Sequence, residues 1–259
     1  MELATTMYGD HGSPVVVLHG LFGSGRNWMT AARRLSDGHR VVTVDLRNHG
    51  SSPWTDSMSY PEMAADVHEA IGALGLGPVA LVGHSMGGKT AMLTALQHPE
   101  VVDRLVVVDV APVEYPPAFL EYAKAMRAAR LDGVRRRAEV EEQLMEAVPE
   151  PGTRAFLLQN LVLDDAGARW RPNLQAIESA LPAISGWPDG VTASYQGPTL
   201  FVFGGKSRYV TPEQHATIAQ LFPAARLTEI PEAGHWVHAE RLDDFLAAVT
   251  PFVDEGDKG

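Results

Sequence analysis

Val79-Ala-Leu-Val-Gly-His-Ser-Met-Gly-Gly88 is the stretch that decides the fold, because an apolar run leads into a Gly-x-Ser-x-Gly turn. A helix-compatible stretch, Lys89 to Gln97, follows the turn. A serine on so tight a strand-to-helix turn occupies strained backbone and needs small neighbours, which Gly83 and Gly87 supply. The helix directs its first N–H groups to the place where negative charge develops when an oxygen attacks a carbonyl. The pattern therefore predicts Ser85 as a nucleophile at the end of a buried strand.

The length and composition of the chain exclude several classes of protein. The chain of 259 residues is long enough for one large α/β domain, and no linker-like tract divides it. It contains no cysteine, so nucleophilic chemistry must come from oxygen or nitrogen. The formal net charge of −11 disfavours nucleic acid as a partner. Residues 1–14 lack a signal-peptide pattern and no apolar run could cross a bilayer, which favours a cytoplasmic protein without membrane insertion. The sequence leaves the oligomeric state open.

Apolar, β-branched runs alternate with helix-compatible stretches along most of the chain. This alternation predicts the α/β class, with a mostly parallel central sheet and helices on both faces. The expected strands are 15–18, 40–44, 79–82, 105–108, 199–203 and 226–230, with an edge strand within 3–8. The expected helices are 28–35, 60–74, 89–97, 212–221 and 241–253.

The alternation stops between Pro112 and Gly197, where the sequence is helical over a length far beyond an ordinary connection. Prolines punctuate this block into about four short helices. The strand pattern resumes at Thr199, so the block is expected to be an inserted helical cap over the edge where the strands end. The predicted division is a core of residues 1–111 and 198–259 and a cap of residues 112–197.

The loop His19-Gly-Leu-Phe-Gly23 directly follows the first central strand. In folds with this serine turn, a backbone N–H of that loop and the N–H after the nucleophile form an oxyanion hole. The spacing assigns these N–H groups to Leu21 and Met86, with Phe22 as the alternate. Losing one such donor typically costs about two to three orders of magnitude in turnover.

The segment Gly234-His-Trp236 follows the last expected strand and precedes the last expected helix. A histidine at this strand end is placed to take the proton from Ser85, so His235 is the predicted base. His238 lies on the next turn, where it is expected to face the helix surface.

The acid that orients His235 departs from the commonest pattern. That acid usually follows the strand 199–203, but the turn there reads Gly204-Gly-Lys-Ser207. A hydroxyl can hold an imidazole tautomer, but it gives no full charge to stabilise the imidazolium. Asp109 ends the strand beside the nucleophile strand and is therefore the predicted acid, with Ser207 as its accessory. The alternative is that Asp109 only caps the turn after its strand.

Five motifs together resemble those of α/β-hydrolase-fold serine esterases over nearly the full chain. They are His19-Gly-Leu-Phe-Gly-Ser24, Asp45-Leu-Arg-Asn-His-Gly50, Gly83-His-Ser-Met-Gly-Gly-Lys89, Asp109-Val-Ala-Pro112 and Ala233-Gly-His-Trp-Val-His238. The chain is most similar to small cytoplasmic bacterial esterases and their mitochondrial relatives that share the Asp-x-Ala-Pro and Gly-Gly-x-Ser turns. The resemblance implies cleavage of short to medium acyl esters or thioesters, with Asp109 as the triad acid, Ser207 as its accessory and the motif at Asp45 as structural.

Some alternatives stay open and others are excluded. Perhydrolysis, haloperoxidase-type activity and acyl transfer to an alcohol use the same triad, so the sequence does not separate them from hydrolysis. Haloalkane dehalogenases and epoxide hydrolases need a carboxylate where Ser85 stands. A dinucleotide site is excluded, because a Gly-x-Gly-x-x-Gly read from Gly23 needs a small residue where Trp28 stands. No cofactor is expected, and no metal, since the histidines and carboxylates show no recognisable ligand spacing.

Aromatic and apolar side chains near the serine and in the cap are candidates for the substrate pocket, although each could equally be core. They are Phe22, His84, Phe119, Tyr122, Phe156, Leu157, Leu161 and Trp187.

Overall fold

The computed structural model describes residues 1–117 and 119–255. In that part of the chain one sheet has seven strands, in the order β1-β3-β2-β4-β5-β8-β9. Strand β1 (Thr5–Tyr8) runs antiparallel to β3 (Arg40–Val44) at one edge, and the other pairings within this sheet are parallel. The remaining strands are β2 (Pro14–Leu18), β4 (Val79–His84), β5 (Val102–Val108), β8 (Thr199–Gly204) and β9 (Ala225–Ile230). The predicted mostly parallel sheet is confirmed.

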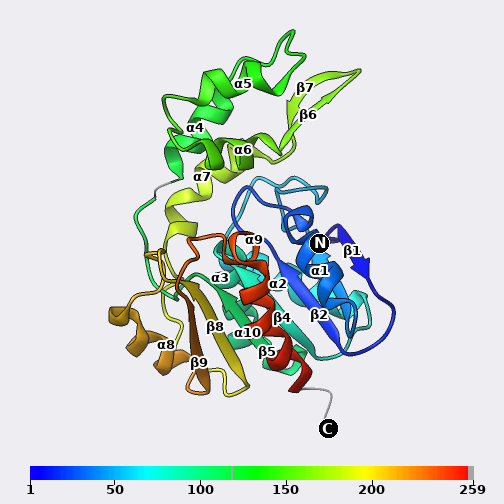
Figure 1. Cartoon of the computed structure of the whole chain (residues 1–259), viewed down its shortest axis with the longest axis vertical. Helices are drawn as coiled ribbons and strands as arrows, with labels where there is room; N and C mark the ends of the chain where they lie inside the picture. Colours follow the sequence, from blue (N-terminus) through cyan, green and yellow to red (C-terminus); the bar gives the residue numbers. More distant parts are fainter. Residues whose placement is uncertain (118, 256–259) are drawn as a thin grey trace.

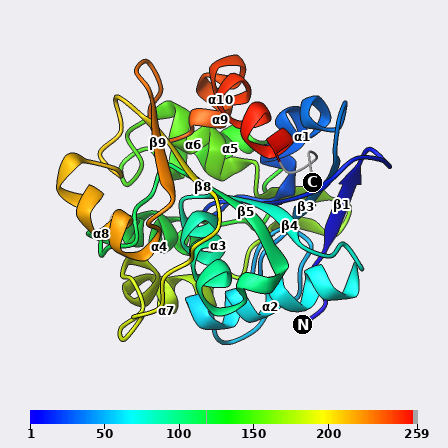
Figure 2. The same cartoon turned by 90° about the horizontal axis from the view of Figure 1, so that it is seen from below.

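Alternate residues of β2 enter two apolar cores, one on each face of the sheet. Val16 and Leu18 pack into the core under α2 (Tyr60–Ala73), α3 (Met86–Gln97) and α8 (His215–Leu221). Val15 and Val17 pack into the core under α1 (Met29–Leu35) and α10 (Leu242–Asp254). Figure 2 shows the two helical layers with the strands between them. Burial on both faces explains why these strands appear in the sequence as continuous apolar runs.

Helix α3 begins at Met86, three residues before the start predicted from the sequence. Gly87 and Gly88 are poor helix formers, so helix propensity alone does not predict the first turn. The Lys89 N–H donates to Ser85 O at 3.0 Å and closes that turn. Short 3₁₀ turns at Gly25–Trp28, Pro99–Val101 and Pro212–Gln214 and the short helix α9 (Val237–Glu240) complete the core.

The chain between β5 and β8 forms a separate layer above the sheet (Figure 1). We keep the name cap for residues 112–197. Its described helices are α4 (Leu120–Ala128), α5 (Arg137–Leu144), α6 (Pro151–Leu158) and α7 (Leu174–Ser185). It also contains an antiparallel hairpin of β6 (Leu161–Asp164) and β7 (Gly167–Trp170), which corrects the expectation of helices alone. The signal for the hairpin is the tight turn that Gly167 permits, with φ at 109°.

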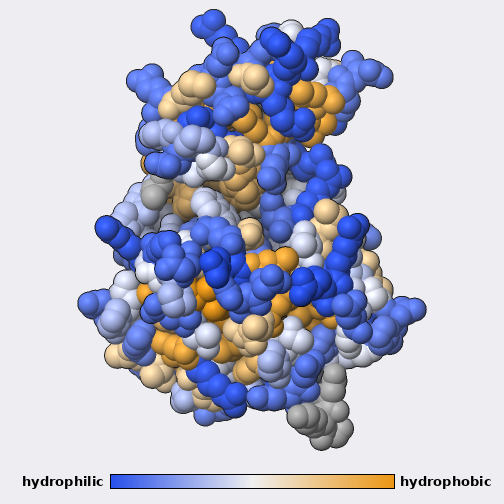
Figure 3. Space-filling view, in the orientation of Figure 1, coloured by the Kyte–Doolittle hydropathy of each residue, from blue (hydrophilic) through white to orange (hydrophobic). Residues whose placement is uncertain are grey.

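Hydrophilic residues cover most of the face in Figure 3, and the molecule narrows between the cap and the part that holds the sheet. Among the described residues, no helix has both the length and the apolar composition needed to cross a bilayer.

Candidate active site

Ser85 occupies the sharp turn between β4 and α3, with φ 52° and ψ −119°. This backbone conformation is strained for a residue with a side chain. The turn also requires very close backbone approach, because a Cβ on Gly83 would lie 2.2 Å from Gly87 O and one on Gly87 would lie 2.4 Å from His19 O. The Ser85 N–H donates to Val108 O at 3.0 Å, which ties the turn to the neighbouring strand β5. The glycines therefore let the serine project from the sheet edge.

Ser85, His235 and Asp109 form a continuous chain of polar contacts across the ends of three segments. His235 Nε2 lies 3.1 Å from Ser85 Oγ, and His235 Nδ1 lies 2.7 Å from Asp109 Oδ2. Asp109 is fully buried, whereas the His235 side chain is 13% exposed. With Nδ1 donating to the carboxylate, Nε2 is left as an acceptor for the serine proton.

Asp109 accepts hydrogen bonds from two further groups. The Ser207 hydroxyl donates to Oδ2 at 2.5 Å and the Gly204 N–H donates to Oδ1 at 2.9 Å. Ser207 Oγ in turn accepts from Tyr209 N–H at 3.2 Å. The hydroxyl therefore contacts the aspartate rather than replacing it, and the Gly204 turn anchors the carboxylate to the adjacent strand β8.

His235 is also fixed from its backbone and from one ring face. His84 Nε2 donates to His235 O at 2.9 Å, and burial lowers the pKa of His84 well below its usual value. The Tyr209 ring stacks on the His235 ring with centroids 4.2 Å apart. A neutral His84 therefore serves as a fixed donor that places the loop of His235.

The N–H groups of Leu21 and Met86 have no hydrogen-bond acceptor among the described residues. Both residues line a cavity that Ser85 also borders. The Phe22 N–H, by contrast, donates to His49 Nε2 at 3.1 Å and is not free for a ligand. The geometry thus favours the Leu21 N–H over the Phe22 N–H as the candidate donor to a ligand.

The loop that carries Leu21 rests on two buried histidines. His19 Nε2 accepts from Leu46 N–H at 3.0 Å, and His49 Nε2 accepts from Phe22 N–H. Burial lowers the pKa of His49 to about 3 and also lowers that of His19, so both rings are neutral near pH 7. The segment that follows β3 thus has a supporting role beneath the loop.

Two cavities meet at Ser85, and both are also lined by Leu21 and Phe119. The histidine-side cavity is bordered by His235, Trp236 and Phe156. A wider groove shares Trp236 and Phe156 with it. The helix-side cavity is lined by Tyr60, Met86, Lys89, Val110, Tyr115, Pro116, Leu181, Ile184, Ser185 and Tyr209.

The candidate pocket residues divide into two groups. Phe119, Phe156 and His84 line one or both cavities. The others lie outside both cavities: Phe22, Tyr122, Leu157, Leu161 and Trp187. Of these, Phe22, Leu157 and Leu161 are buried in the core, Tyr122 packs on Phe119 and Trp187 packs near Tyr60. We infer that the residues of the second group support the pocket from behind and do not line it.

His238 corrects the sequence analysis, because it is buried rather than on the helix surface. Its ring stacks on Trp28 with centroids 3.9 Å apart and an angle of 7° between planes. Burial lowers its pKa to about 3. Sequence spacing around a short helix gave no signal for this contact, since Trp28 belongs to a distant segment.

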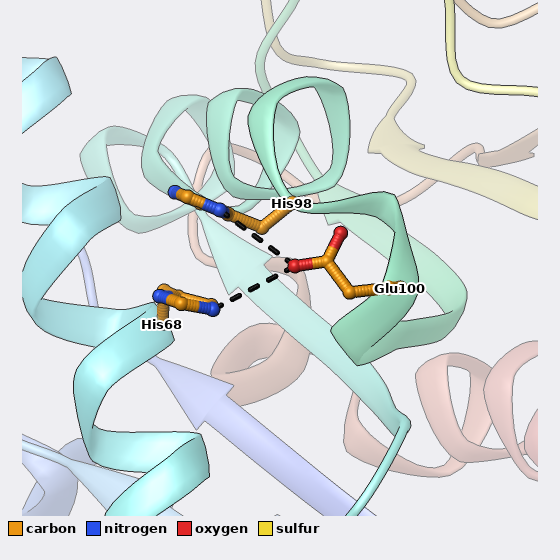
Figure 4. Close-up of side chains that lie close together, drawn as sticks. All are labelled: His68, His98 and Glu100. Carbon is orange, nitrogen blue, oxygen red and sulfur yellow. Dashed lines mark ion pairs between the residues drawn. The ribbon is translucent and has the colours of Figure 1, made fainter.

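A group with metal-ligand character, which the sequence spacing did not predict, connects α2 with the turn that follows α3 (Figure 4). Glu100 Oε1 lies 3.6 Å from His68 Nε2 and 3.8 Å from His98 Nδ1. The imidazole rings are stacked, with centroids 4.0 Å apart and 12° between planes. Ring nitrogens bind metals along lone pairs in the ring plane, so two parallel rings do not direct their lone pairs to one ion at ~2 Å. We therefore assign no metal to this cluster.

Known proteins resemble the chain over nearly its whole length. The model of the "alpha/beta hydrolase fold" family matches residues 13–242. The chain belongs to the α/β-hydrolase family. This hydrolase is 46% identical to "sn-1-specific diacylglycerol lipase ABHD11" of Mus musculus, over 95% of this chain and 82% of the relative. It is 35% identical to "Esterase YbfF" of Escherichia coli (strain K12), over 97% of this chain and 98% of the relative.

A solved structure named "Marine microorganism esterase" superposes on this hydrolase with a TM-score of 0.93. The two are 38% identical, and the match covers 97% of this chain and 99% of the other. The hydrolase therefore lies among the ester-cleaving enzymes of its family, and the predicted fold class is confirmed.

Proposed function

We propose that this hydrolase cleaves carboxylic esters or thioesters of short to medium acyl chains through Ser85, His235 and Asp109. The observation that carries the proposal is the chain of contacts from Ser85 Oγ through both His235 nitrogens to the buried Asp109 carboxylate. The names of the relatives, esterase and lipase, support the substrate class.

In the first half of the reaction, Ser85 Oγ bonds to the acyl carbon while His235 Nε2 takes the hydroxyl proton. The carbonyl oxygen becomes an oxyanion, which the Leu21 and Met86 N–H groups stabilise. The imidazolium, held by Asp109, then gives its proton to the leaving alcohol or thiol as the C–O or C–S bond breaks. The acyl group remains on Ser85.

In the second half, water attacks the acyl carbon while His235 Nε2 takes a proton from the water. The bond from the acyl carbon to Ser85 Oγ breaks, and the proton returns to Oγ. The products are a carboxylic acid and free enzyme, so atoms and charge balance without any cofactor.

The two cavities fit the two parts of an ester. The leaving group must lie beside His235 Nε2, because that nitrogen supplies its proton, and this requirement assigns it to the histidine-side cavity and the groove that continues from it. The acyl chain then occupies the helix-side cavity, whose apolar wall includes Met86, Leu181 and Ile184.

Hydrolysis of chromogenic acyl esters from two to sixteen carbons tests the proposal, with wild type and Ser85→Ala compared side by side. We expect wild-type turnover to fall by about 10⁴-fold or more in the variant, because the nucleophile is lost. The same residual rate in both proteins would overturn the assignment of Ser85. A wild-type optimum above medium chain length would overturn the assigned range of acyl chains.

A further inference from the structure

Lys89 connects the helix that starts after the nucleophile to both segments that join the core to the cap. Its Nζ lies 2.7 Å from Val113 O, on the segment that leads into the cap. It also lies 3.0 Å from Ser185 O and 2.5 Å from Gly186 O, at the end of α7, where the chain returns. Lys89 is only 2% exposed. One buried side chain thus contacts both connections of the cap.

The donors and acceptors at this contact match in number. An ammonium group has three N–H donors, and three carbonyls surround it. Burial lowers the pKa of Lys89 to about 7, although nearby Glu114 opposes that shift. A neutral amine retains two N–H donors, so the contact persists with either charge.

The end of α7 receives further donors from Tyr60 of the core and Tyr115 at the start of the cap. The last carbonyls of a helix have no partner within the helix, and Lys side chains often bond to them. Ile184 O accepts from the Tyr60 hydroxyl at 2.7 Å, and Ser185 O accepts also from Tyr115 N–H at 2.9 Å. Lys89, Tyr60 and Tyr115 therefore form one group, which we call the clasp, that caps the last turn of α7.

The clasp is also a wall of the helix-side cavity. All three of its side chains line that cavity beside Ile184 and Ser185. Lys89 Nζ lies 4.7 Å from the Tyr115 ring centroid and 5.7 Å from that of Tyr60, so the three pack together. Met86 and Lys89 are three residues apart on α3, which places them on the same helix face about 4.5 Å apart along its axis. The part of the wall that Lys89 forms therefore lies at a fixed distance from the Met86 N–H group.

We propose that Lys89 is a positioning residue that holds the cap connections in place and thereby limits the acyl chain length that this hydrolase accepts. The inference rests on the proposed function in taking the helix-side cavity as the acyl site. Lys89 contacts no reacting atom in this account. It acts through the positions of Val113, Ser185 and Gly186, which it bonds, and of the cavity wall that these segments complete.

The test compares Lys89→Met with wild type on chromogenic esters of two, four, eight and twelve carbons, together with amide hydrogen exchange. Methionine keeps an unbranched apolar side chain, one heavy atom shorter than lysine, but donates no hydrogen bond, so the amides of residues 113–115 and 184–190 are expected to exchange faster. A looser wall is expected to raise the eight- to two-carbon ratio of kcat/KM by about tenfold, which corresponds to about 1.4 kcal/mol. The change should appear mainly in KM for the eight-carbon ester.

Arg127→Met is the matched control, because it removes the ion pair between Arg127 and Glu178 that joins α4 to α7 without touching the clasp. It should keep the wild-type chain-length profile.

A wild-type profile and wild-type exchange in Lys89→Met would overturn the inference. If that variant does not fold, Tyr60→Phe, which removes the donor to Ile184 O, must shift the profile in the same direction, and an unchanged profile there would overturn it. If the wild type hydrolyses no ester, the proposed function fails, whereas hydrogen exchange still decides whether Lys89 holds the cap connections.

Discussion

Asp109 lies at an unusual strand end, where its carboxylate contacts the candidate base His235. Its backbone has φ 51°, a conformation that is rare for a residue with a side chain, and its carboxylate accepts from His235, Ser207 and Gly204. Strained backbone of this kind persists where surrounding contacts hold it in place. The serine in the Gly204-Gly-Lys-Ser207 turn therefore supports the carboxylate from the strand that usually provides it.

Asp109→Asn should lower kcat by about 10⁴-fold, because an amide does not hold the productive imidazole tautomer or stabilise the imidazolium. Ser207→Ala removes one hydrogen bond to a charged group and leaves the carboxylate, so a loss of about ten- to a hundredfold is expected. Steady-state kinetics on one ester, with thermal unfolding to verify folding, measures both. A larger loss in Ser207→Ala than in Asp109→Asn would reverse the two assignments.

The turn of the strand-turn-helix element of β4 and α3 depends on close backbone contact. Gly87 lies against the carbonyls of Leu18 and His19, so the helix start touches the end of β2 directly. This contact also places Ser85 and Leu21 beside each other, since Leu21 follows the same end of β2. The element therefore couples the stability of the turn to the geometry of the site.

Gly87→Ala should destabilise the protein by about 3 kcal/mol or more, because the added Cβ would lie 2.4 Å from a backbone carbonyl that cannot move without displacing β2. Gly72→Ala is the control, since Gly72 is exposed on α2 and its Cβ would meet nothing within 4 Å. That change should stabilise by about 0.5 to 1 kcal/mol. Urea unfolding of both variants checks the prediction, and equal effects would contradict it.

Across the whole molecule, four buried histidines make the free energy of unfolding depend on pH in the acid range. Burial lowers the pKa of His19, His49, His84 and His238 below the ordinary value of 6.5, to about 3 for His49 and His238. The unfolded chain therefore binds more protons than the folded chain between pH 6.5 and the folded-state pKa values. The stabilisation is present above pH 6.5 and is lost as the pH falls.

The free energy of unfolding should thus fall below pH 6.5, with a slope of up to about 1.4 kcal/mol per pH unit for each of these histidines. His238→Phe keeps a ring against Trp28 and should reduce the slope by about one histidine. Chemical denaturation at pH 7, 6, 5 and 4 measures it. His215→Gln, on an exposed side chain, is the control. A slope in His238→Phe equal to that of wild type would show that His238 does not take part.

The sequence by itself determined the sheet, the serine turn and the order of the candidate triad. Strand ends in a parallel sheet meet at one edge, so Ser85, Asp109 and His235 could be placed from their positions after strands alone. Hydrophobic runs and glycine spacing are local properties, and they indicate local backbone geometry directly.

The tertiary structure alone decided which side chains face the cavities, where His238 lies and what Lys89 contacts. Each of these depends on segments far apart in the chain: Trp28 lies against His238, and Ser185 against Lys89. Periodicity shows that a side chain is buried, but not which distant residue it meets. That choice follows from how the cap packs on the core, where hydrogen-bond partners and shape act over long sequence separations.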